Sequence, residues 1–260
     1  MMPLAWPVRA GLWGVAAFVL ALLYGPLFLA IFFSFFTLKS NRVQWDSFSF
    51  AAYAKLMENQ RIIDALQNTF VVGAAAVALS LVFGTLLACY YHGRRGRGRE
   101  LLQIVIFLPF LMPPILTGLS LLIFFRQVDF DRSLVTVVIG HTVFVLALVY
   151  RNILARLQTI SRSLVEASLD LGANRWQTFR YVLAPQLMSA FLAAGILAFA
   201  LSFDETLITL LVTGTKSTLP MWLWSMMRLG FTPDINALVA LVLIGTTLLC
   251  LLATRYLTKP

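Results

Sequence analysis

Six long apolar stretches, separated by short polar segments, dominate the sequence. They lie approximately at residues 11–36, 69–91, 101–125, 133–154, 187–212 and 235–257. A helix needs about 20 apolar residues to cross the hydrocarbon core of a bilayer, so each stretch can form one transmembrane helix. With 60% hydrophobic and only 12% charged residues, the composition is far from that of a water-soluble domain. The sequence therefore predicts an all-α integral membrane protein with about six transmembrane helices.

Little of the 260-residue chain lies outside these stretches. The polar segments are too short for a nucleotide-binding or hydrolytic domain of ordinary size, and the phosphate-binding pattern G-x-x-x-x-G-K-[ST] does not occur. The first stretch follows Arg9 and runs to Phe36, which is too long for a cleaved signal peptide, so we expect a retained anchor. We place a domain boundary between residues 1–64, the first helix with its following loop, and a core of residues 65–260.

Basic residues are distributed unevenly between the two sides of the predicted membrane protein. If the N-terminus is inside, that side holds twelve basic residues against three acidic ones, and the other side holds eight against six. The twelve are Arg9, Arg94, Arg95, Arg97, Arg99, Arg151, Arg156, Arg162, Arg175, Arg180, Arg255 and Lys259. Short cytoplasmic loops are enriched in Lys and Arg, so both termini are predicted to be cytoplasmic. The rival interpretation, a nucleic-acid patch at HGRRGRGRE (residues 92–100), is disfavoured by the flanking spans.

Isolated polar features inside the spans predict local structure rather than chemistry. Three prolines between residues 109 and 114 predict a kink, which either borders a cavity or improves packing. His141 has no companion at metal-binding spacing and is interpreted as a hydrogen-bonding group between helices. Cys89 and Cys250 have neither disulfide nor metal spacing, so no metal site is predicted.

Two loops predicted on the outer side mix aromatic with polar residues and are long enough for short helices. They are residues 37–68 and 213–234. Their aromatic residues include Trp45, Phe48, Phe50, Tyr53, Trp222 and Trp224. Such residues favour a membrane interface, and they could equally form a landing surface for an external partner.

The most informative segment is cytoplasmic and reads SRSLVEASLDLGANRWQTFRYVLAPQ, residues 161–186. Ser163 and Glu166 fit an S-x-x-E capping box, which predicts a helix beginning at Leu164. Gly172 can adopt the left-handed conformation that ends such a helix. The segment therefore begins with one short helix.

A second short helix follows in the same segment. Asn174 can cap it, and Pro185 is expected to stop it. Its apolar residues, Trp176, Phe179 and Leu183, repeat on one face. A pair of helices joined at a glycine would form a compact knob able to sit in a groove of another protein; an amphipathic loop lying on the membrane is the alternative.

The spacing within this segment resembles the EAA loop of ABC-importer permeases. The pattern of that loop is E-A-A, three residues, G, nine residues, then I-x-L-P. The matching residues are Glu166, Ala167, Ser168, Gly172, Val182, Ala184 and Pro185. Three of them, Ser168, Val182 and Ala184, differ from the usual residues but are small or apolar.

The resemblance runs from about Ala65 to the C-terminus and implies a type I, MetI-like importer fold in a bacterial inner membrane. It implies that the helix from Glu166 to Gly172 docks into a cytoplasmic ATPase, making residues 161–185 a coupling loop. It also implies its partners: two P-loop ATPase subunits that hold ATP and Mg, a second homologous permease, and an extracytoplasmic binding protein. The chain itself is then not an enzyme and needs no cofactor of its own.

The fifth apolar stretch contains Asp204 and Glu205, two acidic residues inside a span. On one helix, polar residues at 202, 205 or 206, and 209 would share a face, and these are Ser202, Glu205, Thr206 and Thr209. Intramembrane acids often line a water-filled path, so this stripe is a candidate substrate pathway that attracts a cation. Alternatively, one acid pairs with an arginine such as Arg228 or caps a neighbouring helix.

The region around these acids, SFDETLITLLVTG followed by TLPMWLWSMMRLGFTPDINALVAL, is similar to the PotC-like branch of spermidine and putrescine permeases. That resemblance implies a polycationic substrate, which paired acids suit. The same branch includes permeases for opine-like amines and aminophosphonates. An ion-coupled secondary transporter would leave the pattern from Glu166 to Pro185 unexplained. A membrane enzyme lacks a nucleophile-base pair, since His92 and His141 lie away from Asp204 in the predicted topology.

Overall fold

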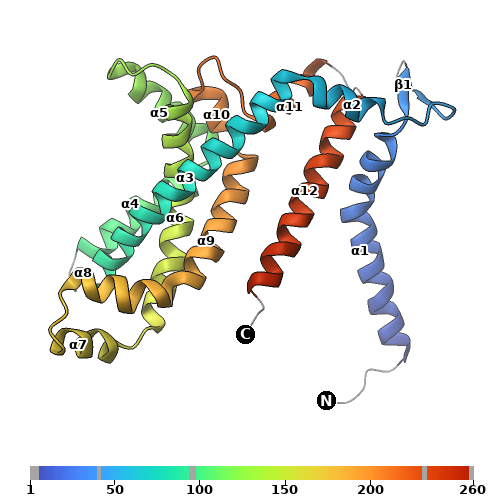
Figure 1. Cartoon of the computed structure of the whole chain (residues 1–260). Helices are drawn as coiled ribbons and strands as arrows, with labels where there is room; N and C mark the ends of the chain where they lie inside the picture. Colours follow the sequence, from blue (N-terminus) through green and yellow to red (C-terminus); the bar gives the residue numbers. More distant parts are fainter. Residues whose placement is uncertain (1–5, 40–41, 94–97, 230–232, 258–260) are drawn as a thin grey trace. The chain divides into compact units, whose positions relative to one another are not determined.

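The computed structural model describes residues 6–39, 42–93, 98–229 and 233–257. Within these residues the chain is mostly α-helical, with one π-helical segment and one short β-hairpin (Figure 1). The elements are α1 (Trp6–Phe33), β1 (Thr37–Lys39), β2 (Arg42–Gln44), α2 (Ala51–Glu58), α3 (Gln60–Gly93), α4 (Gly98–Leu111), α5 (Pro114–Gln127), α6 (Leu134–Thr159), α7 (Arg162–Asp170), α8 (Arg175–Thr178), η1 (Phe179–Leu183), α9 (Ala184–Asp204), α10 (Leu207–Val212), α11 (Leu219–Leu229) and α12 (Pro233–Leu257).

Several of these helices are long and apolar enough to cross a membrane. Four helical segments qualify by themselves: α1, α3, α6, and the run from α8 through α9, Arg175–Asp204. The pair α4 and α5 forms one further, broken span. The last apolar stretch lies in α12, a helix of 25 residues. The prediction of an all-α membrane protein is confirmed. Four or five helices of the described residues are long and apolar enough to be spans, so the sixth predicted span, in α12, stays a prediction.

The third apolar stretch bends where the sequence has its prolines. α4 and α5 meet at 105°, with Pro113 at the break. Pro113 has no N–H, so the carbonyl of Pro109 loses its helical donor. The hydroxyl of Thr117 donates to that carbonyl instead, at 3.3 Å. The predicted kink is confirmed, and the freed carbonyl is satisfied inside the protein, as a membrane setting requires.

The fifth apolar stretch, residues 187–212, is not the single helix that its composition predicts. α9 ends at Asp204, the backbone of Glu205 is extended (φ −73°, ψ 111°), and α10 is a separate six-residue helix. The expectation of one helical face running from Ser202 to Thr209 is therefore wrong, because the helical phase does not continue across the break.

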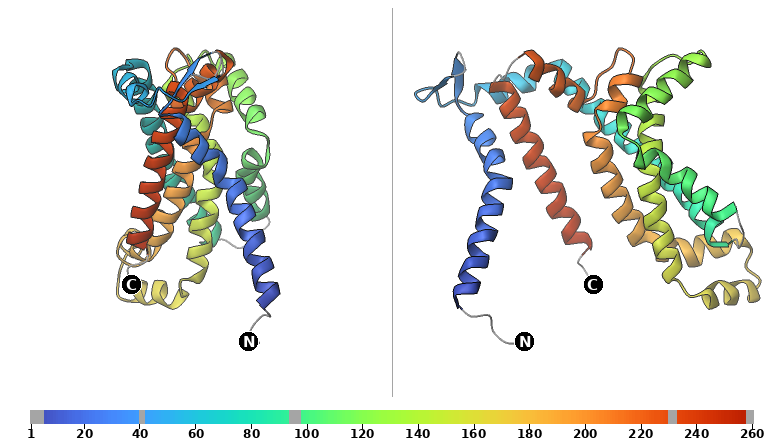
Figure 2. Two further views of the ribbon diagram at one scale, coloured as in Figure 1. Left: turned by 90° about the vertical axis from the view of Figure 1, so that its right-hand side faces the viewer. Right: turned by 180° about the vertical axis from the view of Figure 1, so that it is seen from behind.

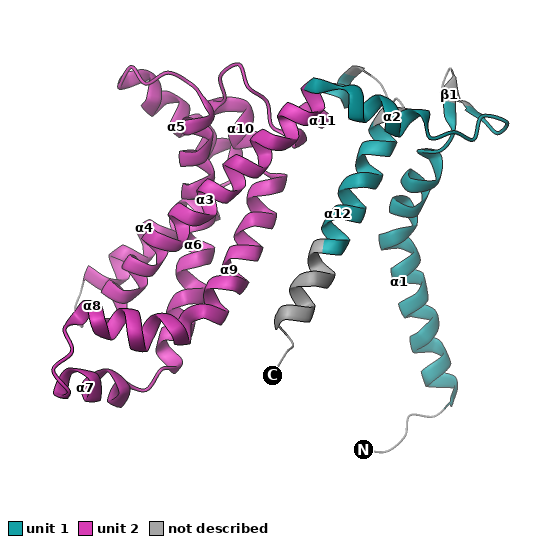
Figure 3. Ribbon diagram, in the orientation of Figure 1, with its two compact units in different colours: residues 1–60, 225–260 teal, residues 61–224 magenta. Residues whose placement is uncertain are grey.

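The chain divides into two compact units (Figure 3). One contains residues 1–60 and 225–260, and the other contains residues 61–224. The C-terminal helix α12 packs with α1 and α2 in the smaller unit. The division into residues 1–64 and 65–260 stays a prediction.

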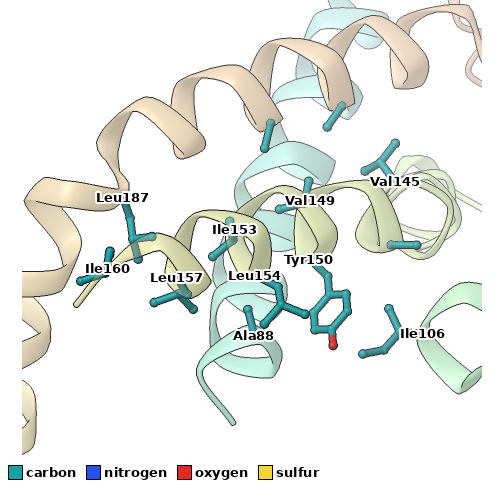
Figure 4. Packing of buried hydrophobic residues seen from close by; sticks show 13 residues of the cluster. Ala88, Ile106, Val145, Val149, Tyr150, Ile153, Leu154, Leu157, Ile160 and Leu187 are labelled. Carbon is teal, nitrogen blue, oxygen red and sulfur yellow. The ribbon is translucent and has the colours of Figure 1, made fainter. Parts of the chain in front are cut away.

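The larger unit is built around α6, which packs against α4, α9 and α10. Val145, Val149, Tyr150 and Ile153 on α6 are fully buried (Figure 4). Cys89 of α3 packs against this core as an apolar residue. Lipid tails are as apolar as these side chains, so close van der Waals contact between helices is what holds such a core together.

Two glycines bring α10 unusually close to its neighbours. A Cβ added at Gly140 of α6 would lie 2.6 Å from Cγ2 of Ile208, and one at Gly118 of α5 would lie 3.1 Å from Cα of Ile208. Small residues at helix contacts permit such an approach. The short helix α10 is thus held between α5 and α6.

The smaller unit has an aromatic cluster next to the outer end of α1. Phe35 packs against Phe48, Phe50 and Tyr53 with ring centroids 5.4–5.6 Å apart, and the hydroxyls of Ser34 and Tyr53 are 2.6 Å apart. Phe48 and Phe50 remain 63% exposed. An exposed aromatic cluster suits a membrane interface; its use as a landing surface stays a prediction.

Different elements lie at the two ends of the larger unit. α7 and α8 lie at one end, and α10 with the segment after α5 lies at the other (Figures 1 and 2). Arg94, Arg95, Arg97 and Lys259, which contribute to the predicted topology, lie outside the described residues, as does the side chain of Cys250.

Candidate functional site

The segment of residues 161–186, which the sequence singles out, folds as a helix, a turn and a second helix. α7 begins at Arg162, because the hydroxyl of Ser161 accepts a hydrogen bond from the N–H of Ser163 at 3.3 Å. The predicted capping box of Ser163 and Glu166 is therefore wrong, and the helix starts two residues before Leu164. Ser163 lies within the first turn, and the side chain of Glu166 is exposed.

Gly172 ends α7 in the predicted manner. Its φ is +84°, in the left-handed region that favours glycine. Its N–H donates to the carbonyl of Leu169 at 2.9 Å, and the N–H of Ala173 donates to that of Ser168 at 3.1 Å. These two bonds form a Schellman motif, so the prediction for Gly172 is confirmed.

The second helix begins as predicted and ends differently. Asn174 and Gln177 cap each other's backbone N–H groups at 2.8–2.9 Å. Pro185 was expected to stop the helix, and this is wrong. η1 carries the chain through a π-helical turn in which the N–H of Ala184 reaches the carbonyl of Phe179. Pro185, which has no N–H to donate, follows this turn as the second residue of α9. α8 is thereby continuous with a membrane helix.

A buried pair of hydroxyls joins α7 to α8. The oxygens of Ser168 and Thr178 are 2.9 Å apart, and both residues are buried. Ser168 is one of the positions that departs from the family pattern, and here it has a partner that alanine would lack. Several large apolar side chains on this pair of helices stay exposed instead: Leu164, Leu169, Leu171, Trp176 and Tyr181. The pair is internally fixed and presents an apolar surface.

The two acidic residues of the fifth stretch lie at the break between α9 and α10 and differ in environment. Glu205 is 8% exposed, and its Oε1 accepts a hydrogen bond from the N–H of Ile208 at 2.9 Å. It therefore caps α10, which is the alternative role considered for this pair. Asp204 is exposed and Thr206 is half-buried. The break thus leaves Asp204 as the accessible carboxylate.

His141 connects the polar residues on either side of the break. Its Nδ1 is 2.8 Å from the hydroxyl of Ser202, and its Nε2 is 2.8 Å from the hydroxyl of Thr209. Thr209 also donates to the carbonyl of Glu205 at 3.1 Å, so it accepts from Nε2–H while Ser202 donates to Nδ1. The prediction that His141 bonds between helices is confirmed.

These contacts divide the residues of the candidate substrate pathway. Ser202 and Thr209 face His141 in the interior of the larger unit, at 2% and 0% exposure. Both residues belong to the stripe predicted from the sequence. No spacing rule links residues about 60 positions apart, so their contact with His141 could not be predicted in this way. The face of the predicted fourth span on which His141 lies is a weak signal that could have pointed to this contact.

Comparison with known proteins agrees with this architecture. Residues 80–258 match the family described as "Binding-protein-dependent transport system inner membrane component". The chain is 32% identical over 247 residues to the putrescine transport system permease protein PotI of Escherichia coli K12, covering 91% of this chain and 88% of that protein. It is 27% identical over 249 residues to the spermidine/putrescine transport system permease protein PotC of the same organism, covering 95% and 93%.

A solved structure shares the fold. It is the crystal structure of a bacterial ABC transporter involved in import of the acidic polysaccharide alginate. The TM-score is 0.75 at 16% identity, and the match covers 98% of this chain and 96% of that one. At this level of identity the likeness concerns the arrangement of the helices alone.

Proposed function

This chain belongs to the family of binding-protein-dependent transport system inner membrane components, and we propose that it carries putrescine or spermidine into the cytoplasm. It is an ABC-importer permease of the polyamine-type family, a multi-pass inner membrane protein and not an enzyme. The observation that carries the substrate proposal is the 32% identity to PotI, which extends over 247 residues and so includes both candidate sites.

The geometry of the acidic pair supports a cationic substrate. Glu205 is occupied as the cap of α10, whereas Asp204 is exposed at the same break. A carboxylate at an interruption of a membrane helix can attract an ammonium group over several ångströms, and more strongly where water is partly excluded. Under this proposal, Asp204 is the substrate-facing member of the pair.

The proposed driving force comes from partner subunits. Two P-loop ATPase subunits would hold ATP and Mg, and the exposed apolar side chains around Glu166 and Gly172 would dock into them. Because α8, η1 and α9 form one helical run, Arg175–Asp204, a displacement of the docked pair would be passed directly to the acidic break. A second, homologous permease would complete the pathway, and an extracytoplasmic binding protein would deliver the substrate.

The first test is uptake of labelled putrescine and spermidine by cells that lack this chain but keep its neighbouring genes. The intact chain should restore ATP-dependent uptake, and a Gly172→Val variant should not, because a β-branched residue is strained at φ +84°. Gly11→Val is the matched control, since nothing lies within 4 Å of a Cβ at that position.

The outcomes separate the substrate from the mechanism. Unchanged polyamine uptake on deletion would remove this substrate and direct the search to opine-like or aminophosphonate compounds. Uptake that persists without the ATPase partners would favour an ion-coupled secondary transporter. Normal transport by Gly172→Val, at normal abundance in the membrane, would contradict the coupling role of the turn.

A further inference from the structure

Side chains from three helices meet at the cytoplasmic end of the larger unit. The guanidinium carbon of Arg99, on α4, lies 3.9 Å from the centre of the Tyr91 ring of α3, which is a cation–π contact. The Tyr91 ring is perpendicular to that of Tyr150 on α6, with centroids 6.0 Å apart. Neither transport site uses these residues.

This cluster contains two buried polar groups without a hydrogen-bond partner among the described residues. One is the hydroxyl of Tyr150, a residue that is 0% exposed, and the other is Nε of Arg99. Figure 4 shows the Tyr150 hydroxyl pointing away from α6, on the side where Ala88 of α3 and Ile106 of α4 lie. A guanidinium can only donate, and a phenol donates readily. What the cluster lacks is an acceptor, and leaving buried donors unpaired is costly.

A shallow, open apolar groove, lined by residues of α4 alone, adjoins the cluster. It has a volume of about 290 Å³ and is lined by Glu100, Gln103, Ile104, Phe107, Leu108 and Leu111. Two contacts join it to the cluster: Tyr91 donates from its hydroxyl to Oε1 of Gln103 at 3.3 Å, and the Phe107 ring lies 6.1 Å from that of Tyr150. The groove is polar at the end near the cluster and apolar beyond it.

We propose that the cluster and groove bind an anionic phospholipid of the cytoplasmic leaflet. The phosphate oxygens accept hydrogen bonds from Nε of Arg99 and the hydroxyl of Tyr150, and one acyl chain lies along α4 from Ile104 to Leu111. Charge-assisted bonds of this kind are among the stronger ones, and basic pockets between helices on the cytoplasmic side suit acidic headgroups.

The charge around the cluster favours an anionic over a zwitterionic lipid. The guanidinium of Arg99 gives the cluster a positive charge. A choline headgroup would bring a second cation toward it, whereas the headgroup of phosphatidylglycerol carries none. Glu100, at the rim of the groove, is exposed, so solvent screens its repulsion of a phosphate.

Native mass spectrometry of the full chain in detergent tests this site. The purified protein is incubated with equal amounts of phosphatidylglycerol and phosphatidylcholine, and the lipid that stays bound is counted. We expect retention of one phosphatidylglycerol in preference to phosphatidylcholine. Arg99→Gln and Tyr150→Phe should each weaken retention about ten-fold, the scale of one lost hydrogen bond to a charged group. Arg9→Gln removes the same charge elsewhere and should leave retention unchanged.

Three outcomes would overturn the proposal. Equal retention of the two lipids would show that no anionic headgroup is recognised. Unchanged retention by Tyr150→Phe, with a higher melting temperature, would show that the hydroxyl is merely an unpaired group. Protection of the wild-type chain against heat by inorganic phosphate, to the same degree as by phosphatidylglycerol, would assign the cluster to a free oxyanion. None of these results depends on which substrate is transported.

Discussion

At the scale of single residues, two adjacent acidic residues have different roles. Asp204 and Glu205 are neighbours in sequence, yet one is exposed and the other is buried as a helix cap. The difference arises because the chain leaves the helical path between them, so their side chains no longer follow one helical phase. Substituting them separately should therefore separate transport from stability.

We predict that Glu205→Ala affects stability and that Asp204→Ala affects transport. Removing a cap costs about 1 kcal/mol, so Glu205→Ala should lower the melting temperature by about 2–4 °C in a chain of this size. Asp204→Ala should leave it unchanged and lower putrescine uptake about five-fold, as loss of roughly 1 kcal/mol of charge attraction implies. Thermal unfolding and uptake assays measure the two. A lower melting temperature for Asp204→Ala together with full uptake would refute this division of roles.

A second residue-scale prediction concerns His141. Replacing it by leucine leaves the buried hydroxyl of Ser202 without its partner, which should cost about 1–3 kcal/mol, whereas Thr209 keeps its hydrogen bond to the carbonyl of Glu205. The triple variant His141→Leu, Ser202→Ala, Thr209→Val removes all three polar partners and should recover part of that loss. Thermal unfolding of both variants is the measurement. If the loss of stability in the triple variant equals the sum of the losses in the three single variants, the three residues do not form one network.

At the scale of elements, the important connection is the uninterrupted run from α8 through η1 to α9. A proline in that run would ordinarily break it, and the π-helical turn before Pro185 avoids the break. The helix pair is then fixed internally by the hydroxyls of Ser168 and Thr178. A pair of this kind can act as one rigid body between a docking partner and the membrane.

We expect substitutions in this hydroxyl pair to affect coupling before they affect folding. Thr178→Val removes the bond between the two helices, while Ser168 keeps its hydrogen bond to the carbonyl of Val165. α7 should then loosen from α8, so less substrate should be moved per ATP hydrolysed. The ratio of uptake to ATP hydrolysis, in vesicles that contain the complete transporter, reports the coupling. An unchanged ratio in Thr178→Val would show that the bond has no mechanical role.

At the scale of the whole molecule, the larger unit has a coupling end and an opposite end. α7 lies at one end and the segment that follows α5 lies at the other (Figure 1). The surplus of Lys and Arg assigns the α7 end to the cytoplasm. The membrane should therefore separate Asp170 from Asp131.

Thiol labelling of intact cells tests this topology. In chains carrying one introduced cysteine, Asp131→Cys should react with a membrane-impermeant reagent added outside, and Asp170→Cys should react only after the membrane is permeabilised. The unmodified chain, which has Cys89 and Cys250, serves as the background control. Labelling of Asp170→Cys in intact cells would show that the chain has the opposite orientation in the membrane.

Local sequence patterns were enough to predict the membrane character, the approximate spans, the kink, the Gly172 turn and the Asn174 cap. Each of these follows from local physics: apolar length, the missing N–H of proline, the freedom of glycine at positive φ, and side-chain capping. Tertiary structure alone decided the break after Asp204, the choice of Glu205 as a cap, and the bonds from His141 to Ser202 and Thr209. These depend on where distant helices pack, and in a uniformly apolar stretch the local pattern is the same for one helix as for two.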